Sequence, residues 1–194
     1  MPMATAQERE RRTRAFTAGE VDRMVAAGIL GEDEPVALID GDLVLVSPQS
    51  PEHQWVIEQL AERLRARLPE QVRVSEEKPL SLGPGALTIP EPDLAVVPRR
   101  QAPGRAQAHE ALLVVEVGVT SASDDRGGKA RMYAEAGVAE LWLIDVGART
   151  CEVLGDPRTD GVYASQRTLS AEEHLVLPLR GGELRLAEVL PPTQ

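Results

Sequence analysis

The sequence has a single cysteine, no long apolar run and no excess of basic residues. One thiol, Cys151, cannot form an internal disulfide or a cysteine-built zinc site, so we expect it to be packed as an ordinary core residue. No stretch approaches the roughly 20 apolar residues that span a bilayer. The N-terminal segment Glu8-Arg9-Glu10-Arg11-Arg12 also lacks the apolar part of a signal peptide. We therefore expect a soluble, cytoplasmic protein with no membrane partner.

Basic charge is scarce as well, since the formal net charge is −10. A protein that coats nucleic acid through bulk electrostatics normally carries a basic face, so this balance argues against that class. The net charge does not exclude a local basic groove, although clusters of charged residues more often form solvated surfaces. The two candidate clusters are Arg63, Arg65 and Arg67 on one predicted helix, and Arg99, Arg100 and Arg105 in one loop.

The chain also lacks a linker rich in proline, glycine or serine. With 194 residues and 42% hydrophobic content it can close one core. We therefore expect a single domain over residues 15–194. Residues 1–14 carry alternating charge and few apolar side chains, so we predict a disordered N-terminal arm there.

Helix and turn signals divide the first third of the chain. Thr17 and Glu20 form a capping box that predicts a short helix ending at Gly28. The dipeptide Asp40-Gly41 between Val36–Asp40 and Leu43–Ser47 favours a hairpin. Ser50-Pro51 is a strong helix start, and apolar residues then recur at helical spacing up to Pro69.

Short strands dominate the middle of the chain, and we predict them near residues 72–75, 79–82, 86–89, 93–97 and 112–117. Ser121 or Ser123 can cap a helix that runs to about Ala136, before a buried strand over Leu141–Asp145. A strand, a helix and a strand in this order form a right-handed crossover that makes the two strands parallel. The remainder of the chain alternates like antiparallel edge strands. The pattern therefore predicts an α/β fold with a mixed sheet.

Two acids interrupt apolar runs, Asp93 in Ile89–Val97 and Glu116 in Leu112–Val117. An ionised carboxylate in such a strand is costly unless something compensates it. Two on neighbouring strands repel unless they share a proton, a cationic side chain or a divalent metal. Because 23 residues separate them, both acids could face one side of the sheet and hold Mg²⁺ or Mn²⁺ with several waters. The backbone carbonyl of Val117 could supply another oxygen.

Lys129 is the candidate cation for this site, because it lies near the start of the helix that leaves the Glu116 strand. Its ammonium could orient a metal-bound water or offset charge on a phosphate. A solvated helix lysine is an equally good interpretation on spacing alone. Tyr133, one turn later, could line the site, although a core or rim tyrosine is commoner.

Other catalytic motifs are missing. Gly127-Gly128-Lys129 is not a phosphate-binding loop, because Ser123 stands at the first glycine position and Ala130 at the Ser/Thr position. No Gly-x-Ser-x-Gly elbow is present, which argues against a serine hydrolase. His109 and His174 lack metal-ligand spacing.

Taken together, the motifs resemble the Uma-two family over nearly all of residues 16–190. The downstream segments that carry the resemblance are Glu116-Val117, Ser121, Asp125-Arg126-Gly127, Lys129, Tyr133-Ala134, Gly137-Val138, Glu140-Leu141-Trp142 and Asp145. The upstream segments are Ile39-Asp40-Gly41-Asp42-Leu43, Ser47-Pro48 with His53, and Pro92-Asp93.

The resemblance implies a restriction-endonuclease-like fold of the PD-(D/E)XK nuclease superfamily, with a central mixed sheet flanked by helices and additional antiparallel strands. It implies a metal-dependent phosphodiesterase site in which Asp93 is the motif aspartate and Glu116 the (D/E). The usual lysine position falls on Gly118, and a family lysine on the following helix maps onto Lys129. The family pattern also places His53 near the site, whereas a histidine at a helix start more often bonds to a neighbouring loop.

These observations lead to three functional hypotheses. The first is a metal-dependent deoxyribonuclease that uses Asp93, Glu116 and Lys129 on DNA. The second is a catalytically inactive DNA-binding or protein-interaction module, suggested by Gly118 and by the acidic net charge. The third is a hydrolase of a small phosphoester or nucleotide, which suits an acidic protein with a pocket. We also expect a homodimer, because edge strands invite pairing.

Overall fold

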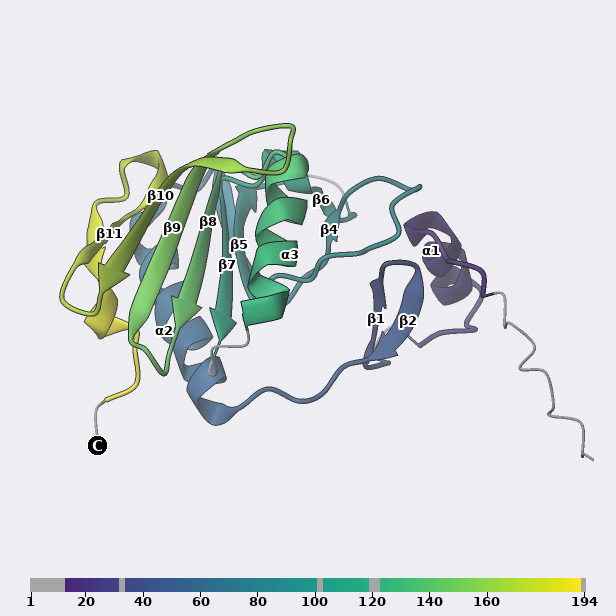
Figure 1. The fold of residues 1–194 in the computed structure, drawn as a ribbon, viewed down its shortest axis with the longest axis horizontal. Coiled ribbons are helices and arrows are strands. Elements are labelled where there is room, and N and C mark those ends of the chain that lie inside the picture. The colour runs from purple at the N-terminus through teal and green to yellow at the C-terminus, as the bar shows by residue number, and fades with distance from the viewer. Residues whose placement is uncertain (1–12, 32–33, 101–102, 119–122, 193–194) are drawn as a thin grey trace, which may run out of the picture.

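The computed structural model describes residues 13–31, 34–100, 103–118 and 123–192, and in residues 123–126 only the backbone. A six-stranded sheet forms its centre (Figure 1). Its strand order is β10-β9-β8-β7-β5-β3. The strands are β3 (Val72–Glu76), β5 (Leu94–Pro98), β7 (Leu113–Gly118), β8 (Glu140–Asp145), β9 (Thr150–Pro157) and β10 (Tyr163–Ser170). The sheet is mixed, because β7 and β8 are parallel and the other described neighbours are antiparallel.

The parallel pair is joined by α3 (Ser123–Glu135), so the predicted crossover is confirmed. Neighbouring parallel strands run in the same direction, so their connection must return the chain to the end of the sheet where the first strand began. A helix packed on the sheet does this. Gly137 follows the helix with a φ of +76°, the left-handed conformation that ends many helices. Ser123 is the first helical residue and not its cap, and Ser121 lies outside the described residues.

Each face of the sheet is covered by a different helix. Leu94 and Val96 of β5 pack in the cluster that contains α2 (Pro51–Arg67), whereas Ala95 and Val97 pack in the cluster that contains Tyr133 of α3. Alternate strand residues point to opposite faces, so a strand made only of apolar residues packs against the core on each face of the sheet. The predicted α/β fold, a mixed sheet flanked by helices, is confirmed.

The long helix α2 starts where the sequence predicts. Ser50 is its N-cap and accepts a hydrogen bond from the backbone N–H of His53 at 3.3 Å, and Pro51 occupies the first turn. The helix buries one stripe of residues against the sheet: Val56, Ile57, Leu60, Ala61 and Leu64. The cap therefore fixes which residues form the first turn, and with them the place of His53.

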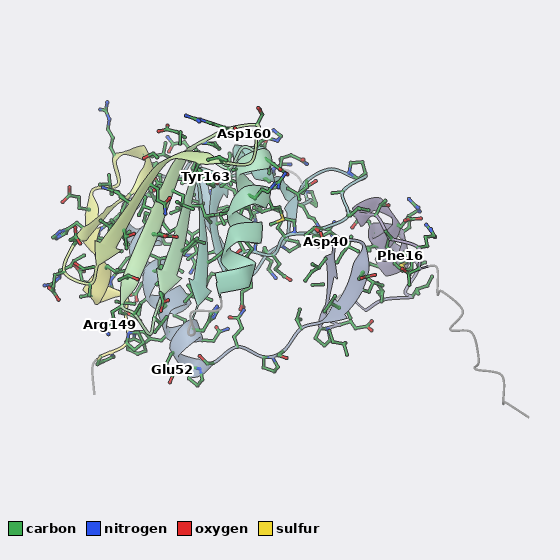
Figure 2. All side chains as sticks on the ribbon, viewed as in Figure 1. Phe16, Asp40, Glu52, Arg149, Asp160 and Tyr163 are labelled. Atoms are coloured by element: carbon green, nitrogen blue, oxygen red, sulfur yellow. The ribbon has the colours of Figure 1, made fainter. Side chains whose placement is uncertain are left out.

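A smaller part of the molecule contains α1 (Ala18–Ala26), β1 (Val36–Ile39) and β2 (Asp42–Leu45), and it extends beyond the sheet at one end (Figure 1). Phe16 and Asp40 lie here, away from Arg149 and Tyr163 (Figure 2). The predicted capping box and the hairpin are confirmed. The turn places Asp40 at φ +50° and Gly41 at φ +86°, as a tight hairpin requires.

Short strand pairs and turns complete the chain. Strands β4 (Leu80–Ser81) and β6 (Ala106–Gln107) form a short parallel pair, and β11 (His174–Val176) and β12 (Glu183–Arg185) form an antiparallel one. Leu175 and Leu184 of the second pair enter the α2-side core. Short 3₁₀ helices span Ala108–Glu110, Pro178–Arg180 and Leu186–Glu188.

Some sequence expectations were wrong. Residues 86–89 do not form a strand: they make isolated backbone hydrogen bonds to the hairpin, from Ile89 N to Leu38 O at 3.0 Å and from Gly41 N to Leu87 O at 2.7 Å. Pro90 follows directly and has no N–H to extend a ladder. The C-terminal strands are not all edge strands either, because β9 lies between β8 and β10. The predicted arm lies almost wholly in residues 1–12, outside the described residues. Within the described ranges, no helix combines the length and apolarity needed to cross a membrane.

Candidate active site

The two acids singled out by the sequence lie side by side at one end of the central strands. Leu94 of β5 pairs with Val115 of β7, so the same antiparallel register, carried one residue further, sets Asp93 opposite Glu116. Directly opposed residues of an antiparallel pair share a face. Asp93 lies just before β5 and not inside it, and the two residues are buried, at 7% and 8% exposed.

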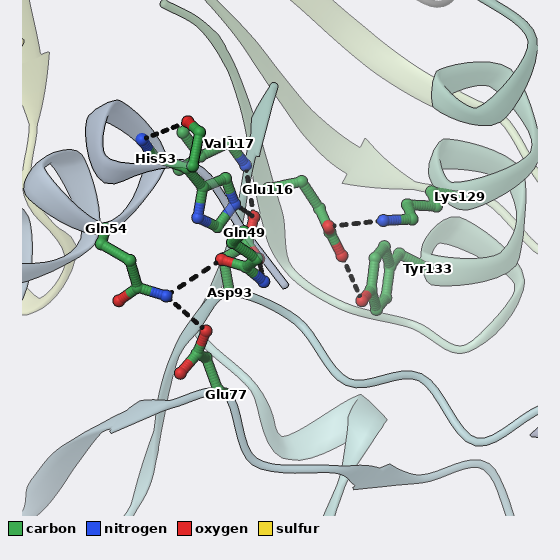
Figure 3. Close-up of polar contacts among 10 residues, drawn as sticks. Gln49, His53, Gln54, Glu77, Asp93, Glu116, Val117, Lys129 and Tyr133 are labelled. Atoms are coloured by element: carbon green, nitrogen blue, oxygen red, sulfur yellow. Dashed lines mark hydrogen bonds and ion pairs between the residues drawn. The ribbon is translucent and has the colours of Figure 1, made fainter. Parts of the chain in front are cut away.

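Asp93 has polar contacts with three residues (Figure 3). Its Oδ2 accepts the backbone N–H of Val117 at 2.6 Å and lies 3.1 Å from Nε2 of His53. Its Oδ1 accepts from the Gln49 amide at 3.4 Å. These partners come from β7, from the first turn of α2 and from the segment before that helix. The aspartate is therefore fixed by contacts from parts of the chain that are distant in sequence.

Glu116 is held from the opposite side by α3 (Figure 3). The Lys129 ammonium lies 2.8 Å from Oε2 of Glu116, and the Tyr133 hydroxyl donates to Oε1 at 2.7 Å. Residues four apart lie on one helix face, so both groups reach the same carboxylate. The structure thus brings Lys129 and Tyr133 of α3 to Glu116, which lies on the preceding strand β7.

Burial sets the electrostatics of this cluster. Desolvation raises the pKa of Glu116 from 4.5 to about 6, the Lys129 ammonium opposes the rise, and the nearby Asp93 adds to it. Burial, and then the charge of Glu116, raises the pKa of Tyr133 well above its usual value. Tyr133 therefore stays a neutral hydroxyl donor across the physiological range.

Sequence reasoning missed a chain of polar residues behind Asp93. The Gln54 amide donates to Gln49 Oε1 at 3.3 Å and to Glu77 Oε1 at 3.1 Å. The backbone N–H of Glu77 donates to the Asp93 carbonyl at 3.1 Å, and Glu77 has a φ of +46°, which is unusual for a residue with a side chain. The one sequence signal for Gln49 and Gln54 was proximity to the His53 helix start, because no periodicity marks a single glutamine, and Glu77 had no such signal.

A cavity of about 1180 Å³ opens beside Glu116 and extends to the β1–β2 hairpin. Lys129 is the one lysine or arginine among the described residues that line it. Five acids line it as well: Asp40, Glu77, Glu91, Glu116 and Glu135. Part of its wall is apolar: Ile39, Val46, Leu82, Leu87 and Ile89.

The arginine clusters lie elsewhere. None of the six arginines is among the described residues that line the cavity. Several are ion-paired with local acids: Arg65 with Glu76, Arg100 with Glu110, and Arg105 with Asp22. These arginines therefore do not form a basic groove at the two carboxylates.

The donor chemistry fits a hydrated hard cation. In the part of the chain that the structure describes, no group of three or more His, Cys, Asp or Glu side chains is arranged to hold a metal ion. Mg²⁺, however, is usually held by one or two carboxylates and keeps several waters. Each carboxylate oxygen has two acceptor positions, and Lys129 and Tyr133 each bind a different oxygen of Glu116. Asp93 and Glu116 thus suit a mostly hydrated ion rather than an all-protein cage.

The arrangement of the sheet and its helices is similar to that of a solved structure. A protein from Anabaena variabilis ATCC 29413, described as "a putative nuclease belonging to DUF820", has the same fold at a TM-score of 0.66 and 15% sequence identity. The similarity covers 84% of this chain and 94% of that one. The family model Uma2, described as "Putative restriction endonuclease", matches residues 20–187.

The chain therefore belongs to the Uma2 family, the same Uma-two family that its motifs resemble, and its fold is that of restriction-endonuclease-like nucleases. No curated protein matches the chain.

Proposed function

We propose that the protein is a divalent-metal-dependent endonuclease that hydrolyses DNA phosphodiester bonds. The observation that carries the proposal is the Lys129 ammonium, 2.8 Å from Glu116, on a carboxylate that lies opposite Asp93 in the strand register. Two buried carboxylates and a partly exposed ammonium supply the charges that metal-assisted phosphoryl transfer needs. Membership of the Uma2 family supports the same reaction class.

Asp93 and Glu116 are the residues that would hold Mg²⁺ or Mn²⁺. The carbonyl of Val117 is a third candidate ligand, because its N–H points to Asp93 and the N–H and C=O of one strand residue point to the same side. When bound, such an ion polarises a phosphoryl oxygen and lowers the pKa of a coordinated water.

The protein's own residues then have distinct tasks. Lys129 offsets the negative charge that develops on the phosphate, since this residue lines the cavity and its side chain is 38% exposed. Tyr133 orients the Glu116 carboxylate through its hydroxyl. With a pKa of about 6, Glu116 is mostly ionised at neutral pH, the form that a cation requires.

The position of Lys129 bears on whether the site is active. The superfamily lysine position falls on Gly118, which ends β7. Because α3 is the next described element after β7 and packs on the sheet, a lysine on this helix reaches the same carboxylate. This contact favours an active enzyme over the catalytically inactive DNA-binding or protein-interaction module.

A cleavage assay with single-stranded, double-stranded and branched DNA in Mg²⁺ or Mn²⁺ tests the proposal. We expect cleavage that EDTA abolishes and that falls at least about 100-fold in Asp93→Asn and Lys129→Met. Asp160→Asn, in an exposed turn, and Lys78→Met, at the chain's other lysine, are matched controls that should keep activity. If Asp93→Asn cleaves DNA as well as the wild type, the proposal is wrong.

The acidic cavity favours one second candidate, a hydrolase of a small phosphoester or nucleotide. Five acids against one lysine would repel the many phosphates of a long duplex, whereas a small substrate presents few. Activity on bis-p-nitrophenyl phosphate and dinucleotides, with none on longer DNA, would select this candidate. Absence of both activities, together with absence of Mn²⁺ binding that depends on Glu116, would select the inactive module.

We further propose that the protein forms a homodimer through the β1–β2 hairpin. Three successive residues at the end of the hairpin are apolar and exposed: Val44 at 40% and Leu45 at 76% in β2, and Val46 at 46% directly after it. Exposed apolar side chains on an edge strand favour pairing with a second copy. Sedimentation analysis should give a dimer for the wild type and a monomer for Leu45→Glu, and a monomeric wild type would contradict this proposal.

A further inference from the structure

His53 occupies an unusual position for a histidine at a helix start. It lies in the first turn of α2, its backbone N–H is bound by the Ser50 cap, and only 7% of its surface is exposed. Its imidazole Nε2 lies 3.1 Å from Oδ2 of Asp93. The histidine is thus held by its own helix on one side and faces the aspartate on the other.

The surroundings of the imidazole select its tautomer. Nδ1 of His53 is buried and has no hydrogen-bond partner among the residues that the structure describes. A proton on Nδ1 would be a buried donor without an acceptor, and Nε2 would then present a lone pair to the carboxylate. The tautomer with the proton on Nε2 avoids both problems, because Nε2 then donates to Asp93.

This donation leaves the two oxygens of Asp93 unequal. Oδ2 receives two donors, the Val117 N–H at 2.6 Å and His53 Nε2, and two donors fill its acceptor positions. Oδ1 receives the Gln49 amide at 3.4 Å, a long contact. The oxygen with capacity for a cation is therefore Oδ1.

We propose that His53 is a positioning residue for Asp93: its Nε2–H occupies Oδ2, fixes the carboxylate rotamer and leaves Oδ1 as the metal-binding oxygen. The inference rests on the proposed metal-dependent function. It differs from a role for His53 as a metal ligand, because a ligand nitrogen must offer a lone pair and not a proton.

Mn²⁺ affinity, measured by calorimetry without substrate, tests this role. His53→Phe keeps a ring but loses the donor, and we expect its Mn²⁺ affinity to fall about 10- to 100-fold. The side-chain amide of His53→Gln can replace the Nε2–H, so this variant should recover most of the affinity. His174→Phe, at an exposed histidine on β11, is the matched control and should bind like the wild type. Wild-type affinity in His53→Phe, or an equal loss in His53→Gln, would overturn the proposal.

A metal-free measurement separates this inference from the proposed function. We expect ¹⁵N chemical shifts of the wild type to show the proton of His53 on Nε2, and side-chain couplings to show one Asp93 rotamer. His53→Phe should average that rotamer, and His53→Gln should restore it. A proton on Nδ1, or a fixed Asp93 rotamer in His53→Phe, would refute the inference even if the protein binds Mn²⁺. A wild type that binds no Mn²⁺ refutes the metal-dependent function instead, and the rotamer still decides the role of His53.

Discussion

Replacing Glu116 by glutamine should stabilise the metal-free protein at neutral pH. The native state holds this carboxylate in a buried site that raises its pKa from 4.5 to about 6. Between these two pH values the folded protein binds more protons than the unfolded chain, so the free energy of unfolding falls as the pH rises through this window. Glutamine mimics the neutral carboxyl group and does not carry this penalty.

The size of the effect follows from the pKa difference. One pKa unit corresponds to about 1.36 kcal/mol, so a rise from 4.5 to about 6 costs the ionised native state about 2 kcal/mol. Loss of the Lys129 ion pair is already included, because that ammonium opposes the rise. For a chain of this size, about 2–4 °C of melting temperature accompany each kcal/mol, so Glu116→Gln should melt about 4–8 °C higher at pH 8.

The assay is urea unfolding of both proteins in EDTA from pH 4 to pH 8. The stability difference should be near zero at pH 4, grow between pH 4.5 and pH 6, and then stay constant. Glu172→Gln, at a carboxylate that is 76% exposed, is the control and should change the unfolding free energy by less than about 0.5 kcal/mol. Added Mn²⁺ should stabilise the wild type alone. A Glu116→Gln variant that is less stable at pH 8, or a difference that does not vary with pH, would refute the reasoning.

Three further substitutions test contacts that support the site and the hairpin. Tyr133→Phe removes the buried donor to Glu116, so urea unfolding at pH 8 should show a loss of about 1.5–3 kcal/mol, and an unchanged stability would contradict the contact. Ser50→Ala removes the α2 cap and should cost about 1 kcal/mol in the same assay, with no cost if the cap is not formed. Gly41→Ala places a Cβ 2.4 Å from that of Ala15 at a φ of +86°, so it should lower the melting temperature, whereas Gly85→Ala, with nothing within 4 Å, should not.

The local elements could be predicted from the sequence because their signals are local. The capping box of Thr17 and Glu20, the turn at Asp40-Gly41 and the Ser50-Pro51 helix start depend on neighbouring backbone groups. The crossover over β7, α3 and β8 was also predictable, since its handedness and parallel pairing follow from chain connectivity. The prediction of a strand at residues 86–89 was wrong because their alternating apolar side chains belong to a loop that packs on the hairpin.

The site divides in the same way. By itself the sequence determined that Asp93 and Glu116 need compensation, because a carboxylate in an apolar strand is costly wherever the strand lies. The tertiary structure alone decided what compensates them: the β5–β7 register sets the acids opposite each other, α3 delivers Lys129 and Tyr133, and α2 delivers His53. Such contacts join residues tens of positions apart through strand pairing and helix packing, and no local pattern encodes the distance between them.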